Sequence, residues 1–167
     1  MTRHLFLTGP KHIGKSTVID KLMASVSLTV GGFRTVHIDT ILHDRFSVHM
    51  LRPDEKPAEE NLLFICGEPS AETATRFDTL GCAALAQSVN AELILMDELG
   101  FLEAEAYRFQ NAVLSALDGD IPILGVLQRT DSPFLRQVAA HKNATVIEVT
   151  LENRDTLPQI LRHEFHF

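Results

Sequence analysis

The sequence of 167 residues is poor in cysteine and has no long hydrophobic run. Its two cysteines, Cys66 and Cys82, do not form a CxxC pair and are too few for a disulfide scaffold. No apolar stretch approaches the ~20 residues that a membrane-spanning helix needs. The first apolar run, Leu5-Phe6-Leu7, is also too short for a signal peptide. We therefore expect a cytoplasmic protein that does not enter a membrane.

A surplus of positive charge is also missing. The chain has 15 Lys and Arg against 22 Asp and Glu, a net charge of -7. This balance disfavours nucleic acid as a partner, because non-specific affinity for it comes from clustered Lys and Arg. The eight histidines show no metal-ligand spacing such as H-E-x-x-H. With 45% hydrophobic residues, the chain can build one real core, so we expect a single domain over residues 1–167.

Short apolar runs alternate with amphipathic segments along the chain. Leu5-Phe6-Leu7 stops at Gly9-Pro10 and predicts a buried strand, and helical spacing from Lys15 predicts a helix. Gly31-Gly32 predicts a turn into the next strand. Further strands are expected at 33–38, 93–96, 121–127 and 145–149, and further helices at 71–90, 103–117, 133–140 and 151–161. Buried strands separated by helices indicate a mostly parallel sheet with helices on both faces, a three-layer α/β fold.

Residues 39–67 interrupt this alternation. Two apolar runs, 46–51 and 61–66, flank a charged, proline-containing link at 52–60. We expect a hairpin or a lid-like excursion here. Because such a link buries little, we also expect it to be more mobile than the sheet and to respond to a ligand.

The segment between the first strand and the first helix matches the pattern G-x-x-x-x-G-K-[ST]. Backbone N–H groups of such a loop and the helix N-terminus form an anion-binding concavity. In this pattern Lys15 contacts the β and γ phosphates, and the Ser16 hydroxyl is a ligand of Mg²⁺. The sequence thus predicts a P-loop for a nucleoside triphosphate with Mg²⁺ as cofactor. The candidate nucleotide-binding residues are Gly9, Pro10, Lys11, His12, Ile13, Gly14, Lys15, Ser16 and Thr17.

An acidic pair follows the apolar run Leu93 to Met96. Parallel sheets bind their ligands at the carboxyl ends of strands, so Asp97 is placed to hold Mg²⁺ in the Walker B manner. Glu98 is the candidate base that orients or deprotonates the attacking water, and Glu103 is the next candidate. The structural alternative is an acidic pair that caps the following turn. An arginine could stabilise the transferring phosphoryl group, and the candidates are Arg34, Arg45, Arg76 and Arg129.

Taken together, these residues resemble the THEP1-type nucleoside-triphosphatases, also called cancer-related NTPases. The resemblance rests on Arg3-His4-Leu5-Phe6-Leu7-Thr8-Gly9-Pro10 before the loop, Gly32-Phe33-Arg34-Thr35, Leu95-Met96-Asp97-Glu98-Leu99-Gly100 with Glu103, and Val149-Thr150-Leu151-Glu152-Asn153-Arg154. It implies a RecA-like P-loop fold and slow hydrolysis of NTPs to NDPs and phosphate with broad tolerance of the base. It also implies that Asn153 and Arg154 lie near the base.

Three departures from the family pattern are visible. Lys11-His12 replace small residues after Gly-Pro, Phe101 replaces a lysine, and the family's glycine- and arginine-rich hairpin is not recognisable in residues 39–67. Two other functions therefore stay open. A nucleotide or small-molecule kinase would share the P-loop but needs an acceptor site. A nucleotide-dependent switch or accessory subunit would bind nucleotide with incidental turnover, and its protein partners are not predicted by the sequence.

Overall fold

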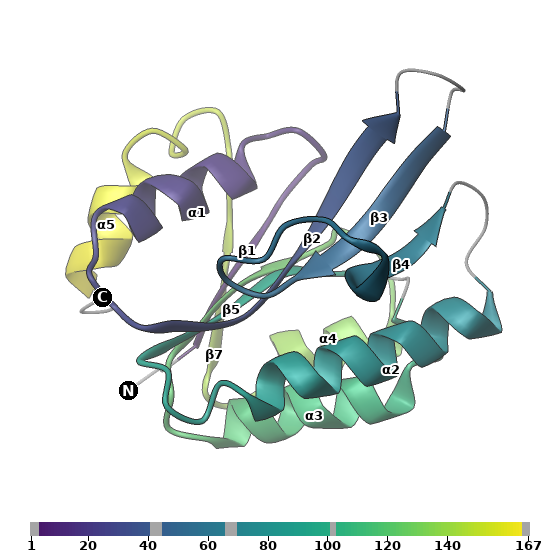
Figure 1. Cartoon of the computed structure of the whole chain (residues 1–167). Coiled ribbons are helices and arrows are strands. Elements are labelled where there is room, and N and C mark those ends of the chain that lie inside the picture. Colours follow the sequence, from purple (N-terminus) through teal and green to yellow (C-terminus); the bar gives the residue numbers. More distant parts are fainter. Residues whose placement is uncertain (1–3, 41–44, 66–69, 101–102, 165–167) are drawn as a thin grey trace.

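The computed structural model describes residues 4–40, 45–65, 70–100 and 103–164. Here a seven-stranded sheet, in the order β4-β3-β2-β5-β6-β1-β7, lies between two layers of helices (Figure 1). The strands are β1 (His4–Thr8), β2 (Val30–Thr40), β3 (Arg45–Leu51), β4 (Leu62–Ile65), β5 (Leu93–Leu99), β6 (Ile123–Leu127) and β7 (Ala144–Glu148). The helices are α1 (Lys15–Ala24), α2 (Ala71–Ala86), α3 (Tyr107–Asp118), α4 (Pro133–Ala139) and α5 (Leu157–Glu164), with a 3-10 turn η1 (Glu59–Asn61). The predicted three-layer α/β fold is confirmed.

Each face of the sheet has its own hydrophobic core. Successive side chains of a strand point to opposite faces, and β1 follows this rule. Leu5 and Leu7 pack in the core under α1 and α5, whereas Phe6 packs in the core under α2, α3 and α4 (Figure 1). The central strands are buried on both faces, which explains why their sequences are continuous apolar runs.

Parallel pairing brings the functional segments to one edge of the sheet. β1 pairs in parallel with β6 and with β7, and β5 pairs in parallel with β6 and with β2. The carboxyl ends of these strands therefore meet at the same edge. The loop after β1 and the acidic end of β5 lie at this edge.

The two apolar runs within residues 39–67 form β3 and β4. β2 and β3 pair antiparallel, and β3 pairs antiparallel with β4. β2 continues from Arg34, opposite Asp97 on β5, to Thr40, so the antiparallel strands extend past the site edge of the parallel part (Figure 1). The run 61–66 extends beyond the described residues at its last position.

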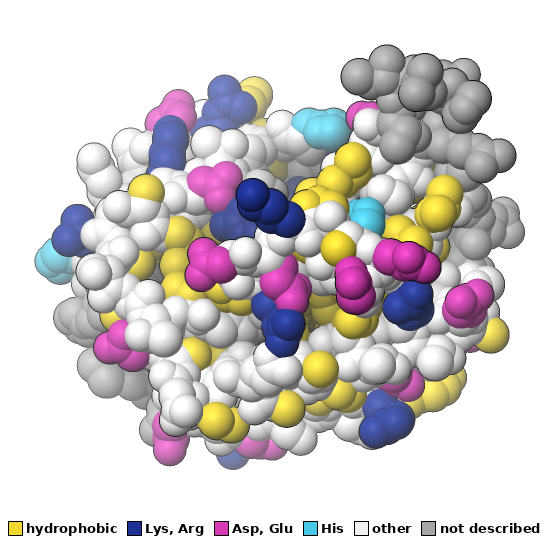
Figure 2. Space-filling model, viewed as in Figure 1, with side chains coloured by type: hydrophobic (Ala, Val, Ile, Leu, Met, Phe, Trp, Pro, Cys, Tyr) yellow, Lys and Arg dark blue, Asp and Glu magenta, His cyan; other side chains and the backbone are white. Residues whose placement is uncertain are grey.

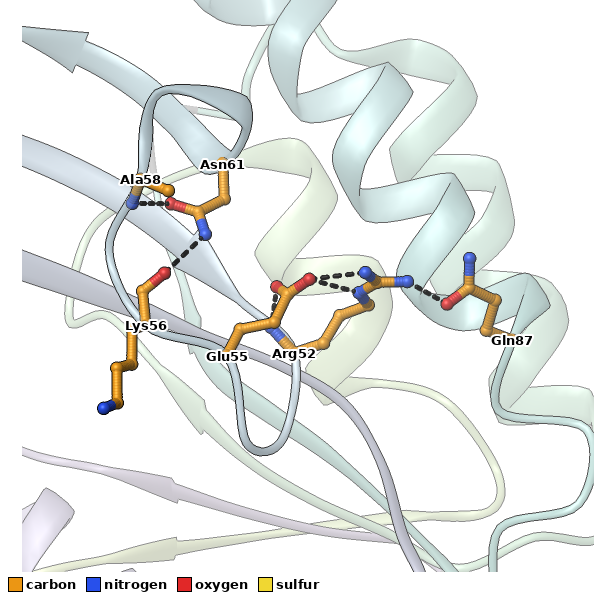
Figure 3. Close-up of polar contacts among 6 residues, drawn as sticks. All are labelled: Arg52, Glu55, Lys56, Ala58, Asn61 and Gln87. Carbon is orange, nitrogen blue, oxygen red and sulfur yellow. Dashed lines mark hydrogen bonds and ion pairs between the residues drawn. The ribbon is translucent and has the colours of Figure 1, made fainter.

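The link between β3 and β4 is fastened to α2 (Figure 3). Glu55 accepts hydrogen bonds from the backbone N–H and the guanidinium of Arg52, and Arg52 also donates to the side chain of Gln87 at the end of α2. Farther along, the Asn61 carboxamide accepts from the N–H of Ala58 at 3.0 Å. We call these contacts the Arg52 clasp. The clasp fastens the link to the end of α2, and whether the excursion responds to a ligand stays a prediction.

Gly31 and Gly32 are not a turn, as the sequence suggested, but part of β2. A Cβ on Gly31 would lie 2.4 Å from the Ser88 hydroxyl oxygen, and one on Gly32 would lie 1.9 Å from the Leu95 carbonyl oxygen. Gly32 also has a φ of 87°, in the region that favours glycine. These glycines let β2 approach β5 and the end of α2.

Four helices are shorter than predicted, α4 by its last residue only. α2 ends at Ala86 instead of residue 90, α3 begins at Tyr107 instead of residue 103, and α5 begins at Leu157 instead of residue 151. Before α3, the N–H of Ala106 donates to the carbonyl of Glu103 in a tight turn. Before α5, local side-chain bonds hold residues 151–156 as successive turns and thereby compete with the helix.

The surface is mixed in charge. On the face in Figure 2, acidic and basic side chains are interspersed, with apolar atoms between them. The large apolar side chains that are exposed within the described ranges come from separate elements: Ile65, Val89, Tyr107, Leu151 and Ile160. Of the helices in those ranges, none has the length and apolar character needed to cross a membrane.

We predict that Gly32→Ala destabilises the protein by about 2 to 5 kcal/mol, because it adds backbone strain and a clash with the Leu95 carbonyl. Urea unfolding measures the change. Gly119→Ala is the matched control, since Gly119 has an ordinary φ of -78° and its Cβ would meet the nearest atom at 3.1 Å. Equal stability of the two variants would contradict the tight approach of β2 to β5.

Candidate active site

The loop after β1 has the backbone geometry of an anion cradle. Gly9 and Gly14 have φ values of 143° and 113°, and His12 has a φ of 63°. A Cβ on Gly9 would lie 2.9 Å from the carbonyl oxygen of Val149, so glycine is required there on two grounds. The loop delivers the chain into α1 at Gly14, whose carbonyl accepts the first helical bond from Val18.

The N-terminus of α1 is open toward the loop. No side chain caps it at Gly14, and its first turn holds no acidic residue. Helix N-termini leave N–H groups without helical partners and carry partial positive charge, which favours a phosphate there. Ser16 and Thr17 are exposed on this first turn, as are Pro10, Lys11 and His12 on the loop. The predicted nucleotide-binding residues of the loop are thus brought together.

Lys15 folds back over the loop. Its ammonium donates to the carbonyl oxygens of Gly9 at 3.0 Å and Pro10 at 2.8 Å. The side chain therefore already lies across the concavity. A phosphate oxygen bound in the cradle would offer the ammonium a stronger, charged acceptor than either carbonyl.

Asp97 lies beside this loop on β5. It is opposite Arg34 of β2 in the parallel register, and only 7% of the residue is exposed. Burial is the main cause that raises the pKa of Asp97 from 3.8 to about 6, and the negative charges of Glu98 and Asp20 raise it as well. The positive charges of Arg34 and Lys15 lower this pKa. Lys15 is therefore close enough to Asp97 to influence its charge state.

Glu98 is half-buried next to Asp97, where the pairing of β5 with β6 is interrupted between Met96 and Leu99. The peptide bond between Asp97 and Glu98 is cis. The charge of Glu98 raises the pKa of both Asp97 and Glu103. Glu98 thus lies within electrostatic reach of both Asp97 and Glu103 at the end of β5.

Glu103 is almost completely buried, with 2% of the residue exposed. Its carboxylate accepts a hydrogen bond from the N–H of Gly100 at 2.9 Å, and its carbonyl accepts from the Gln110 side chain at 2.7 Å. Burial raises the pKa of Glu103 to about 7, whereas hydrogen bonds from the backbone N–H groups of Glu103 itself and of Gly100 lower it. Glu103 anchors the segment that follows Glu98.

A cleft of about 240 Å³ lies beside the N-terminal half of α1. Its walls are Gly14, Thr17, Val18, Lys21, Arg154 and Asp155. The guanidinium of Arg154 donates to the carbonyl of Ile13 at 3.4 Å, so Arg154 links this cleft to the loop. Asn153 is used differently. Its carboxamide accepts from the N–H of Thr150 at 2.8 Å and donates to the carbonyl of Glu148 at 2.9 Å, which fixes the turn that presents Arg154.

The four candidate arginines occupy different places. Arg34 faces Asp97, and Arg129 pairs with Glu148 at 3.3 Å beside the end of β1. Arg76 lies on α2, on the sheet face opposite α1 (Figure 1). The side chain of Arg45 lies outside the described residues. The ion pair of Arg34 with Asp20 of α1 was missed by the sequence analysis, although pairing the strand 33–38 with 93–97 would have placed Arg34 beside Asp97.

The donor set fits Mg²⁺. This ion prefers oxygen ligands, keeps several waters, and binds proteins through one or two carboxylates together with substrate phosphates. Ser16 provides a hydroxyl on α1, and Asp97 provides a buried carboxylate on β5. Within the described ranges, no three His, Cys, Asp or Glu side chains form a closed cage for a metal.

A family model described as NTPase matches residues 4–161. The chain belongs to this NTPase family. The nucleoside-triphosphatase THEP1 of Thermofilum pendens is 29% identical over 97% of this chain and 94% of that protein. The cancer-related nucleoside-triphosphatase homolog of Bos taurus is 27% identical over 98% of this chain and 97% of that protein.

A solved structure agrees with the fold of this NTPase-family chain. The crystal structure of THEP1 from Aquifex aeolicus matches with a TM-score of 0.72 and 20% identity, over 95% of this chain and 96% of that one. The resemblance inferred from the sequence motifs is thereby confirmed, together with the P-loop NTPase fold.

We predict that Glu103→Gln increases stability more at pH 8 than at pH 5. A carboxyl group whose pKa rises on folding, here from 4.5 to about 7, binds protons more tightly in the folded state. Its contribution to stability is therefore present below pH 4.5 and is lost as the pH rises through about 7. The gain at pH 8 should be on the order of 2 kcal/mol.

Thermal unfolding of the Glu103→Gln variant and the parent between pH 5 and 8 measures this difference. Glu105→Gln is the control, because Glu105 is exposed two residues along the same segment. A constant difference across the pH range would contradict the raised pKa of Glu103.

Proposed function

We propose that this chain is a Mg²⁺-dependent nucleoside-triphosphatase that converts NTPs to NDPs and phosphate with broad tolerance of the base. The observation that carries the proposal is the adjacency of the two halves of the site. The glycine loop, with Lys15 across it, and the buried Asp97 lie at the same edge of the sheet, and Lys15 lowers the pKa of Asp97. Membership of the NTPase family agrees with this reading.

The loop and Lys15 bind the triphosphate. Residues 9–14, except Pro10, supply backbone N–H groups, α1 supplies its N-terminus, and Lys15 exchanges the carbonyls of Gly9 and Pro10 for phosphate oxygens. Ser16 and Asp97 would hold Mg²⁺, which supplies Lewis-acid polarisation of the phosphates when it is bound. Lys15 stabilises the charge that spreads over the γ-phosphoryl oxygens in the transition state.

Glu98 is the base in this proposal. It receives a proton from the water that attacks the γ phosphorus, while the bond from that phosphorus to the bridging oxygen breaks and the diphosphate leaves. Glu98 is half-buried where the pairing of β5 with β6 is interrupted, so its carboxylate lies near Asp97 and is open to water. Glu103, sealed by the Gly100 N–H and by burial, is less accessible for this task.

The cleft beside α1 supports tolerance of the base. Its polar walls are Lys21 and Asp155, which form an exposed ion pair at 3.8 Å, and the planar guanidinium of Arg154. Flexible charged side chains can contact any base face, whereas strong selection needs buried polar groups that one base alone satisfies. We place the base in this cleft, with Asn153 acting through the turn that carries Arg154.

Phosphate release with ATP, GTP, CTP and UTP, each with and without Mg²⁺, tests the proposal. We expect phosphate release from all four nucleotides, and we expect this release to require Mg²⁺. Transfer of a γ-label to an added acceptor but not to water would point to a kinase. Tight nucleotide binding without turnover would point to a switch.

Lys15→Ala should abolish productive triphosphate binding while the stability of the protein stays within about 1 kcal/mol of the parent. The reason is that Lys15 bonds only to loop carbonyls, which water can satisfy in the variant.

We predict that Glu98→Gln lowers kcat by roughly 10² to 10⁴-fold and changes nucleotide affinity less than about tenfold, because it removes basicity and keeps shape. Asp97→Asn should instead weaken the response to Mg²⁺ and turnover together. Side-by-side titrations of nucleotide binding and phosphate release separate the two roles. Parent-like turnover in Glu98→Gln would transfer the role of base to another residue.

A further inference from the structure

The guanidinium of Arg34 bridges two carboxylates unequally. One nitrogen lies 2.8 Å from an Asp20 oxygen, and another lies 3.9 Å from an Asp97 oxygen. Both contacts are ion pairs, and only the contact with Asp20 lies within hydrogen-bonding distance. Arg34 is therefore held chiefly by Asp20, which is not one of the predicted metal ligands.

Asp20 is well placed to hold Arg34 in this way. It lies four residues after Ser16 on α1, so the two side chains share one face of the helix. The Asp20 side chain is 59% exposed and that of Arg34 is 34% exposed, whereas the side chain of Asp97 is 10% exposed. Asp20 thus engages Arg34 from the solvent side and leaves Asp97 on the inner side.

The position of Arg34 matters because Asp97 is surrounded by charged groups of both signs. Glu98 and Asp20 are negative and raise its pKa, and Arg34 and Lys15 are positive and lower it. A nearby cation helps to keep a buried carboxyl ionised. The same cation would compete with a metal if its N–H groups occupied the carboxylate oxygens.

We propose that Asp20 and Arg34 form a positioning pair in which Asp20 withholds the guanidinium from direct hydrogen bonding to Asp97, so that the oxygens of the Asp97 carboxylate stay open to the metal of the bound nucleotide. The pair acts through Asp97 and touches no reacting atom. The proposal rests on the proposed function, in which Asp97 helps to hold that metal.

A double-mutant cycle on metal binding tests the pair. Binding of Mn²⁺ to the protein with a non-hydrolysable ATP analogue is measured by electron paramagnetic resonance at pH 8, without turnover. Asp20→Asn should weaken Mn²⁺ binding roughly fivefold or more, because Arg34 is then free to bond to Asp97. In the Arg34→Gln background the same Asp20→Asn change should alter binding less than about twofold. Arg34→Met, which keeps an apolar stem, replaces Arg34→Gln in the cycle if that variant unfolds.

Two controls make the outcomes distinct. Asp131→Asn and Arg136→Gln remove an exposed ion pair before and within α4 and should leave Mn²⁺ binding unchanged. Asp97→Asn should weaken it strongly. If Asp97→Asn binds Mn²⁺ like the parent, the metal role of Asp97 in the proposed function is wrong. If Asp97→Asn weakens binding but Asp20→Asn acts equally with and without Arg34, only the positioning pair is refuted.

Discussion

The site depends on the parallel pairing of β1, β6 and β5. Leu7 is paired with Val126, and Met96 with Gly125, so the loop after β1 and the acidic end of β5 flank β6 at the same height. The spacing of neighbouring strands puts β1 and β5 about 10 Å apart. A slip of one residue would turn Asp97 to the other face of the sheet, away from α1. This register requires glycine at position 125, because a Cβ there would lie 2.5 Å from the Phe6 ring.

The features that the sequence predicts well are local. The strand before the loop, the loop itself and the helix after it form one continuous segment, and its glycines require their positions through backbone geometry. The position of Asp97 near the carboxyl end of β5 was also predictable, since the apolar run Leu93 to Met96 directly precedes it. The parallel order of the strands follows from their alternation with helices. For these features, neighbouring residues contain the whole physical cause.

The features that the sequence analysis missed depend on residues far apart in the chain. Gly31 and Gly32 resemble a turn until the strand that they join brings them against Ser88 and Leu95. The first residues predicted for α5 have apolar and polar side chains in helical order. However, hydrogen bonds of the Asn153 side chain hold them in turns instead of a helix. The contact of Arg34 with Asp20 needs both the sheet register and the packing of α1. Such contacts appear only when the pairing of elements is known.

The position of Lys15 has a consequence for how a ligand is retained. Its ammonium is already satisfied by two carbonyls of the loop, so an incoming anion trades partners with the protein and gains only the difference. A small anion that reaches only the ammonium gains little from this trade. A chain of phosphates that also engages the loop amides and the helix end gains much more. In the proposed function, the loop would therefore favour a ligand with more phosphates, and after one phosphate is lost the Lys15 ammonium would return to the carbonyls of Gly9 and Pro10.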